Sequence, residues 1–173
     1  MRAIVVYESL WGNTEKIAQA IGRGLDPILS VDIVTSDAAP DSLEGYDLVV
    51  VGGPTHAFSM TRAATRDEAA LHHSAPHNPA RGIREWIEGL SPVTPPLRAV
   101  TFDTRVDSPR LPGSAAKAAR HELRSLGFDV TTKPHSFRVH GYEGPLVDGE
   151  LARAEEWARG LASLPVQGVT HVS

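Results

Sequence analysis

Short apolar runs alternate along the chain with segments of helical periodicity. Two of the runs, Ala3–Tyr7 and Tyr46–Val51, are almost continuous in β-branched and aromatic residues. Such runs are typical of strands buried on both faces, as the strands of parallel sheets are. Weaker runs predict further strands at Val31–Thr35, Arg98–Asp103 and Phe128–Thr132, the last perhaps resuming at Ser136–Val139.

Four segments place apolar residues three or four positions apart, which predicts helices. The first is Thr14–Leu25 and the third is Ser114–Leu126, which Gly127 ends. The second has Asn78 as cap and Pro79 at its opening, and the fourth begins near the N-cap residue Asp148. The predicted buried stripes of the second and fourth are Ile83, Trp86, Ile87 and Leu90, and Leu151, Ala154, Ala158 and Leu161.

This alternation predicts an α/β fold with helices on both faces of a parallel sheet. We expect one domain over residues 1–164, followed by a tail at 165–173. One connection is unusual: Gly53 to Asn78 spans 26 residues, whereas a strand-to-helix loop normally has ~2–6. Thr61–His73 is a candidate surface helix within it. Loops of this length are usually functional or mobile.

Composition narrows the function classes. The chain has 173 residues, 41% of them apolar, with a net charge of −4 and a pI near 6.0. This charge argues against a general binder of nucleic acid or anionic membranes. Cysteine is absent, so any redox chemistry requires a bound cofactor. The amino-terminal apolar run is too short for a signal peptide or membrane span, so we expect a cytoplasmic protein.

The loop after the first strand carries the clearest chemical signal. Its residues are Ser9, Leu10, Trp11, Gly12, Asn13 and Thr14. The loop leads into a helix amino terminus, where unpaired backbone N–H groups and the helix dipole favour an anion. Gly12 allows close backbone approach, and hydroxyl and amide groups supply neutral donors. A phosphate site is one interpretation, and a well-capped turn is the other.

The run Tyr7–Ala18 resembles the phosphate loop of flavodoxins, whose pattern is Thr/Ser-x-Thr-Gly-x-Thr, and also that of flavodiiron proteins. The resemblance covers most of the chain. It implies a single-domain, flavodoxin-like three-layer sandwich with a five-stranded parallel sheet in the order 2-1-3-4-5. It also implies that residues 9–14 hold the phosphate of FMN. Trp11 departs from the family hydroxyl, so its ring either shields the flavin or packs at the domain edge.

The same resemblance assigns the ring of FMN to two further loops. The first follows the third strand and offers Pro54, Thr55, His56, Ala57 and Phe58. The second follows the fourth strand and offers Asp103, Thr104 and Arg105. This third wall lacks the tyrosine and the acidic residues that flavodoxins commonly place there. We therefore do not expect a very low reduction potential.

Two other clusters carry weaker signals. His72, His73 and His77 lack completing ligands, so we expect no metal site. Arg62 and Arg66 lie one helical turn apart and are interpreted first as solvated charges, and second as contacts for an anionic partner. No catalytic residue is predicted from the sequence.

Three functions remain open. An FMN-binding electron carrier, exchanging electrons with a reductase and an acceptor protein or a small molecule, is favoured. The alternatives are an FMN-dependent NAD(P)H:quinone-type reductase and a flavodoxin-fold interaction module that has lost its cofactor.

Overall fold

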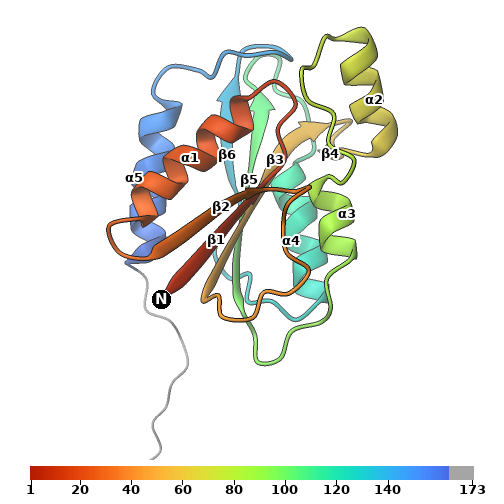
Figure 1. The fold of residues 1–173 in the computed structure, drawn as a ribbon. Helices are drawn as coiled ribbons and strands as arrows, with labels where there is room; N and C mark the ends of the chain where they lie inside the picture. The colour runs from red at the N-terminus through yellow and green to blue at the C-terminus, as the bar shows by residue number, and fades with distance from the viewer. Residues whose placement is uncertain (164–173) are drawn as a thin grey trace, which may run out of the picture.

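A parallel sheet forms the centre of the computed structural model, which describes residues 1–163 (Figure 1). The strands are β1 Arg2–Tyr7, β2 Ser30–Thr35, β3 Leu48–His56, β4 Ser59–Met60, β5 Arg98–Val106 and β6 His135–Val139. The order β2-β1-β3-β5-β6 confirms the predicted five-stranded parallel arrangement, and the two-residue β4 pairs antiparallel with β3 as a hairpin. The predicted tail lies outside the described residues.

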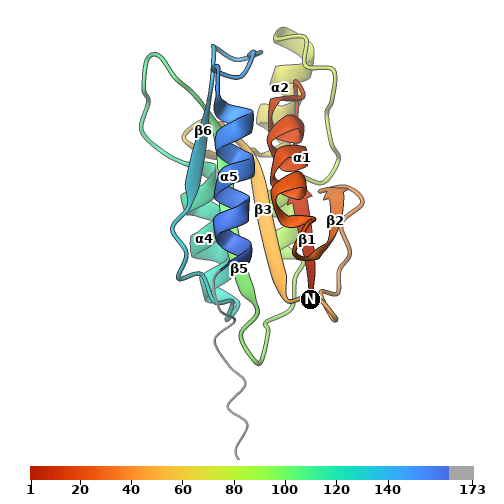
Figure 2. The same ribbon diagram turned by 90° about the vertical axis from the view of Figure 1, so that its left-hand side faces the viewer.

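Helices cover both faces of the sheet. They are α1 Asn13–Leu25, α2 Ala63–His72, α3 Ile83–Glu88, α4 Ala115–Ser125 and α5 Glu150–Ala162. Figure 2 shows α1 and α5 side by side on one face, and α3 and α4 lie on the other. The helix α2 stands away from both layers, near the carboxyl ends of the strands (Figure 1). No helix within residues 1–163 is long and apolar enough to cross a membrane.

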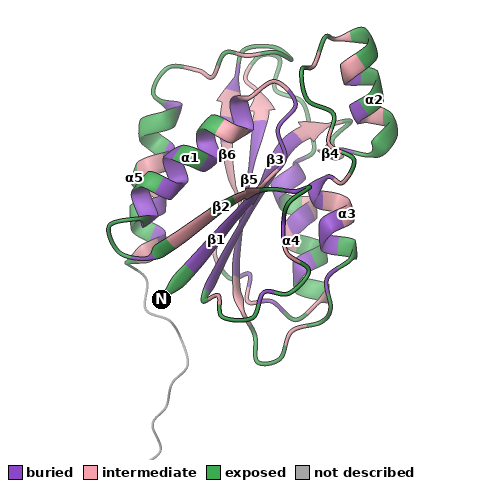
Figure 3. Ribbon diagram, viewed as in Figure 1, coloured by how far each residue is buried: buried purple, intermediate pink, exposed green. Residues whose placement is uncertain are grey.

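Each face of the sheet has its own apolar core, and the central strands belong to both (Figure 3). Residues of β1 alternate between the two: Ile4 and Val6 face α3 and α4, whereas Ala3 and Val5 face α1 and α5. All four are completely buried, which explains why the sequence of β1 is a continuous apolar run.

Two predicted boundaries are wrong for physical reasons. Phe128–Thr132 is not a strand, because only Asp129 bridges Arg98 there; the edge strand is β6, which contains the predicted resumption at Ser136–Val139. The helix expected from Asn78 begins at Ile83, although its predicted stripe is buried. The Ile83 N–H donates to the carboxylate of Glu8 (3.0 Å), which fixes the helix start.

The start of α5 also differs from the prediction. Gly149, with φ +87°, is the N-cap in place of Asp148. Leu151 is 39% exposed, so it does not belong to the buried stripe. Glu150 takes the inward position because its carboxylate accepts the Arg138 N–H (2.6 Å) and pairs with Arg153 (2.6 Å).

The long connection after β3 is structured. It contains β4 and then α2, so the candidate helix within Thr61–His73 is confirmed. Most of α2 is exposed, and it buries only Arg66 and Ala69 (Figure 3). The interpretation of Arg66 as a solvated charge is therefore wrong.

Candidate cofactor-binding site

The three predicted loops meet at one corner of the molecule, where β1, β3 and β5 end. These strands are neighbours in the sheet, with Tyr7 beside Gly52 and Pro54 beside Thr104. Figure 1 shows this edge, from which the chain enters α1 and the hairpin of β3 and β4. Parallel strands thus bring together loops that are far apart in the sequence. Ligands bind at such edges in open α/β sheets.

The first loop leaves the amino terminus of α1 without a side-chain cap. Gly12 is the N-cap residue, with φ +97°, and no side chain bonds the first amides of the helix. A Cβ on Gly12 would have no heavy atom within 4 Å, so the space in front of this turn is open. Exposed amides and the dipole of a 13-residue helix fit the charge of a phosphate. The loop therefore fits the predicted ligand.

Polar side chains of the first loop brace it internally. The Ser9 hydroxyl accepts the Gly12 N–H at 3.0 Å, and the hydroxyls of Thr14 and Thr104 lie 2.8 Å apart. Both threonines are buried, as is Leu10. The Thr14–Thr104 contact joins the first and third predicted loops directly.

The second loop reaches the first through an aromatic contact. His56 stacks on Trp11, with ring centroids 5.6 Å apart and planes 16° apart. The Trp11 indole N–H donates to the carbonyl of His73, so this ring packs against the end of α2. Burial lowers the pKa of His56, which favours the neutral imidazole. The buried Pro54 and half-buried Thr55 precede this contact in β3.

The hairpin turn between β3 and β4 is formed by Ala57 and Phe58. Their φ values are +46° and +69°, a left-handed conformation that non-glycine residues adopt at a cost. Phe58 is 59% exposed, and its backbone lies where a Cβ on Gly113 would be. The Phe58 ring therefore neither anchors the loop in the core nor stacks on Trp11 or His56 within the described structure.

The third loop has an interior acid. Asp103 is fully buried, and one of its oxygens accepts hydrogen bonds from the Ser114 hydroxyl (2.5 Å), the Ala116 N–H (3.0 Å) and the Thr55 hydroxyl (3.2 Å). The other oxygen, Oδ1, is buried and unbonded within the described residues. Asp103 thus holds the start of α4. Arg105 donates to the carbonyl of Leu111, so its side chain braces the loop that follows β5.

A buried polar network behind the first loop was missed by the sequence analysis. Glu8 accepts the Thr61 hydroxyl at 2.5 Å, and Arg66 donates to Thr61 (3.0 Å) and pairs with Glu85. The exposed fraction is 1% for both Glu8 and Arg66. Burial raises the pKa of Glu8, although its hydrogen bonds and Arg66 oppose this. The network fixes α2 and α3 behind the loop, and no local pattern signalled it.

One further residue at this corner was also missed as a site residue. Tyr142, from the connection between β6 and α5, contacts Trp11, His56 and His73 through its ring. Nothing in the sequence indicated that a residue 130 positions after the first loop would reach it.

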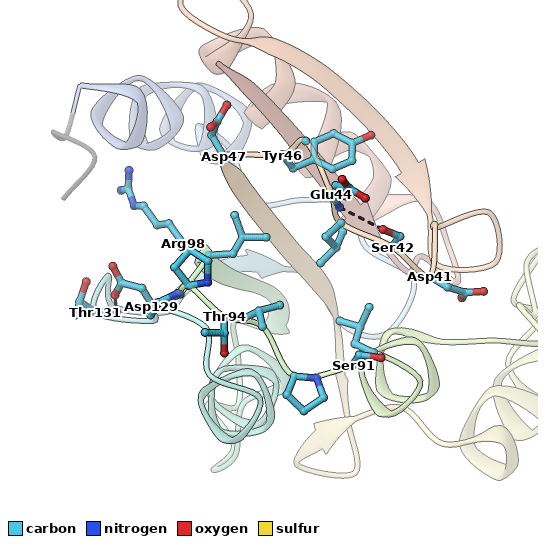
Figure 4. Close-up of a pocket in the computed structure, with 18 of the residues that line it drawn as sticks. Asp41, Ser42, Glu44, Tyr46, Asp47, Ser91, Thr94, Arg98, Asp129 and Thr131 are labelled. Carbon is cyan, nitrogen blue, oxygen red and sulfur yellow. Dashed lines mark hydrogen bonds between the residues drawn. The ribbon is translucent and has the colours of Figure 1, made fainter. Parts of the chain in front are cut away.

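A cavity lies at the opposite end of the sheet, where the strands begin. It has a volume of about 830 Å³ and is lined by the connections that precede β3 and β5 (Figure 4). Four carboxylates, from Asp41, Glu44, Asp47 and Asp129, line it together with Arg98. A smaller cavity of about 340 Å³ adjoins the first loop beside Ser9. The larger cavity does not include the uncapped amides of α1, so its size does not make it the anion site.

Solved structures share this architecture. The chain matches a flavodoxin from the domain Archaea with 19% identity and a TM-score of 0.65, covering 94% of this chain and 96% of that one. It matches oxidised flavodoxin 1 of Bacillus cereus with 16% identity and a TM-score of 0.65, covering 95% and 100%. The flavodiiron protein of Giardia intestinalis matches with 19% identity and a TM-score of 0.60, covering 93% of this chain and 35% of that one.

At the level of sequence, residues 5–79 match the flavodoxin family, and no curated protein matches the chain. The matched segment runs from β1 through the first two loops of the corner, where the flavodoxin-like pattern is densest. The whole described chain has the corresponding fold and strand order. The chain therefore has the flavodoxin fold, and residues 5–79 are similar in sequence to the flavodoxin family.

Proposed function

We propose that this protein is an FMN-binding electron carrier of the flavodoxin type. The observation that carries the proposal is the uncapped amino terminus of α1 at Gly12, placed where the loops after β1, β3 and β5 converge. The match of residues 5–79 to the flavodoxin family supports the same cofactor. No predicted catalytic residue is needed, because the bound flavin supplies the one- and two-electron chemistry.

The residues of the corner have distinct roles in this proposal. Backbone amides at Asn13 and Thr14 hold the phosphate, and the helix dipole stabilises its charge. Trp11 and His56 give the ring of the cofactor an apolar, aromatic contact. The neutral state of His56 suits this role, because a charged imidazole would be poorly solvated there.

Two finer assignments belong to the proposal. The electrons are exchanged with redox proteins, a reductase and an acceptor, or with a small-molecule acceptor. The location is cytoplasmic, as the cysteine-free composition suggests. Neither the identity of a partner nor its docking geometry is needed for the test that follows.

The test is to purify the protein, release any bound flavin by heat and identify it by chromatography. Apoprotein is then titrated with FMN, riboflavin and FAD, following the quenching of flavin fluorescence. We expect FMN to bind much more tightly than riboflavin, which has no phosphate. Equal affinity for FMN and riboflavin would contradict a phosphate site at Gly12. A protein that binds no flavin would overturn the proposal and favour the interaction module.

A second candidate is an FMN-dependent reductase that takes hydride from NAD(P)H. The exposed Phe58 turn and the absence of an aromatic residue from Asp103 to Pro112 favour it, because both leave this edge of the site open. Steady oxidation of NAD(P)H by the FMN-loaded protein with a quinone would identify a reductase. Inertness until a separate reductase is added would identify a carrier.

A further inference from the structure

Four aromatic rings gather at the candidate site, each from a different segment. Besides the Trp11–His56 stack, Tyr142 stacks on His73 with centroids 5.1 Å and planes 11° apart. Tyr142 also lies 6.2 Å from the Trp11 ring and 5.9 Å from the His56 ring, tilted by 56° and 52°. These separations are within the range of favourable aromatic contacts. The connection from β6 to α5 thus contributes a ring to the corner formed by the first two loops.

The segment that carries Tyr142 is held by its own hydrogen bonds. The His140 N–H donates to the carbonyl of Pro145 at 2.8 Å, and the Val147 N–H donates to that of Arg138 at 2.9 Å. Val139 and Leu146 form an antiparallel bridge below them. We name residues 140–145 the aromatic strap. Tyr142 is at its tip, on a base that these bonds fix.

The aromatic strap is also fixed to the first loop. The side-chain amide of Asn13 donates to the carbonyl of Glu143 at 3.0 Å, and Asn13 is only 8% exposed. Gly144, with φ +91°, lies so close that a Cβ there would be 2.6 Å from the Asn13 amide nitrogen. The strap therefore keeps a defined position relative to the amides that α1 offers to an anion.

Tyr142 is 60% exposed even though it touches three rings, so part of its surface remains available to a ligand. The end of β5 and the loop after it, Asp103–Pro112, contain no aromatic residue. Phe58, the other exposed aromatic side chain at this end, contacts none of the four rings within residues 1–163. Tyr142 is thus the ring that both borders the phosphate corner and is held in place.

We propose that Tyr142, presented by the aromatic strap, is the aromatic wall of the flavin site that the loop after β5 does not provide. The inference rests on the proposed function and adds a residue and a segment to it. A planar isoalloxazine gains contact area and exclusion of water from an adjacent ring. Tyr142 acts as a contact and positioning residue, with no proton or bond transfer assigned to it.

The test compares four variants with wild type as apoproteins titrated with FMN. Tyr142→Ala removes the ring and is expected to weaken FMN binding about tenfold. Tyr142→Phe keeps the ring and is expected to stay within about twofold of wild type. Phe58→Ala removes the equally exposed ring that the resemblance assigns to the flavin, and it is expected to weaken FMN binding less than Tyr142→Ala does. Tyr142→Leu, which keeps apolar bulk, provides a second ring-free variant.

Two further readouts separate a ring contact from a general loss of structure. Urea unfolding should give similar stability for all variants, because the Tyr142 side chain is largely exposed. The visible absorption bands of bound flavin should shift in Tyr142→Ala and Tyr142→Leu but not in Tyr142→Phe. The midpoint potential should become less negative without the ring, because water then stabilises negative charge on the reduced flavin.

The outcomes distinguish this inference from the proposed function. If the wild-type protein binds no FMN, the proposed function is overturned. Wild-type protein that binds FMN, with unchanged affinity and spectrum in Tyr142→Ala and Tyr142→Leu, overturns only the inference. A loss in Phe58→Ala that exceeds the loss in Tyr142→Ala would also overturn it, since the wall would then come from the hairpin after β3.

Discussion

The two ends of the sheet differ in cavity size and in chemistry. The amino end has the larger cavity, about 830 Å³, bordered by four carboxylates and one arginine (Figure 4). The carboxyl end offers less open volume beside the first loop, about 340 Å³, yet it has the free amides of α1 and the four-ring cluster. An anionic, aromatic ligand matches the second end because of these amides and rings, although Glu8, Glu15 and Asp37 line the adjoining cavity.

The difference follows from the direction of the strands. Each parallel strand runs toward the carboxyl edge, and the helix that follows begins there with unpaired N–H groups. At the amino edge the helices end, so carbonyl groups and turns collect. The volume of a cavity shows only how much space the side chains leave unfilled, and it does not show which ligand binds there. The orientation of the backbone determines which end attracts an anion.

The strongest test of this difference places the same negative charge at the two ends of the sheet. Gly12 and Gly45 have similar backbone conformations, with φ +97° and +86°, and Gly45 lines the amino-end cavity. We expect Gly12→Asp to weaken FMN binding by at least about 100-fold, ~2.7 kcal/mol, because the carboxylate points into the phosphate space. Gly45→Asp should leave FMN binding unchanged. Fluorescence titration measures both.

A matched neutral variant separates charge from backbone strain. Asparagine tolerates left-handed conformations and has nearly the shape of aspartate, so Gly12→Asn tests the strain alone. It should retain far more affinity for FMN than Gly12→Asp. Equal losses in the two variants would show that the shape of the turn, and not phosphate repulsion, determines binding.

Substituting the arginines at the two ends of the sheet is expected to change the stability of the fold by different amounts. Arg66 is 1% exposed and pairs with Glu85 behind the first loop, whereas Arg98 at the amino end is half-buried and donates to the carbonyl of Leu161. We expect Arg66→Met to lower the free energy of unfolding by about 2–3 kcal/mol, because it leaves buried polar partners unpaired.

The corresponding amino-end change, Arg98→Met, should lower the free energy of unfolding by about 1 kcal/mol or less, since one hydrogen bond is lost. Urea unfolding with both variants gives the comparison. Equal losses in the free energy of unfolding would contradict the prediction that the buried network around Arg66 stabilises the positions of α2 and α3.

The smallest expected effect is a pH dependence at two histidine–tryptophan stacks. His56 stacks on Trp11 at the candidate site, and His135 stacks on Trp157 beside β6 at 5.0 Å. Burial lowers the pKa of both imidazoles below the ordinary value of 6.5. Folded protein then binds protons less readily than unfolded protein. Stability is complete above pH 6.5 and falls as the pH drops through the lowered pKa values.

Urea unfolding at pH 7 and pH 5 measures this dependence. His56→Asn and His135→Asn should each reduce the loss of stability on acidification, because neither asparagine takes up a proton. Only His56→Asn should also change the pH dependence of FMN affinity. A wild-type protein that is equally stable at both pH values, with unchanged behaviour in the variants, would contradict the assignment.

Sequence periodicity predicted most of the fold, because the strands and helices bury apolar faces that a local pattern reveals. The continuous runs of β1 and β3 and the stripes of α1 and α4 were identified in this way. The predicted boundaries are wrong where a contact with a residue distant in the sequence determines where a helix begins. Glu8 sets the start of α3, and the pairing of Glu150 with Arg138 and Arg153 turns Leu151 outward.

The candidate site was predicted only in part for the same reason. Gly12 and its neighbours form a local motif, so their placement at the end of β1 could be anticipated. Arg66 and Tyr142 reach the corner through tertiary contacts across 19 and 130 or more residues, to Glu85 and Trp11. Such contacts leave no periodic signature. The sequence therefore predicts the phosphate loop at Gly12 better than it predicts the aromatic contacts of Tyr142 beside that loop.

The close packing of α1 and α5 has a consequence for the order in which the molecule is made. A Cβ on Gly24 would lie 2.3 Å from the carbonyl oxygen of Glu155, so the backbones of the two helices, which lie side by side in Figure 2, approach each other closely at this position. The helix α1 begins the cofactor corner, and its packing partner α5 starts more than 120 residues later in the sequence. During synthesis on the ribosome, the packing behind this corner is therefore completed only after α5 has emerged.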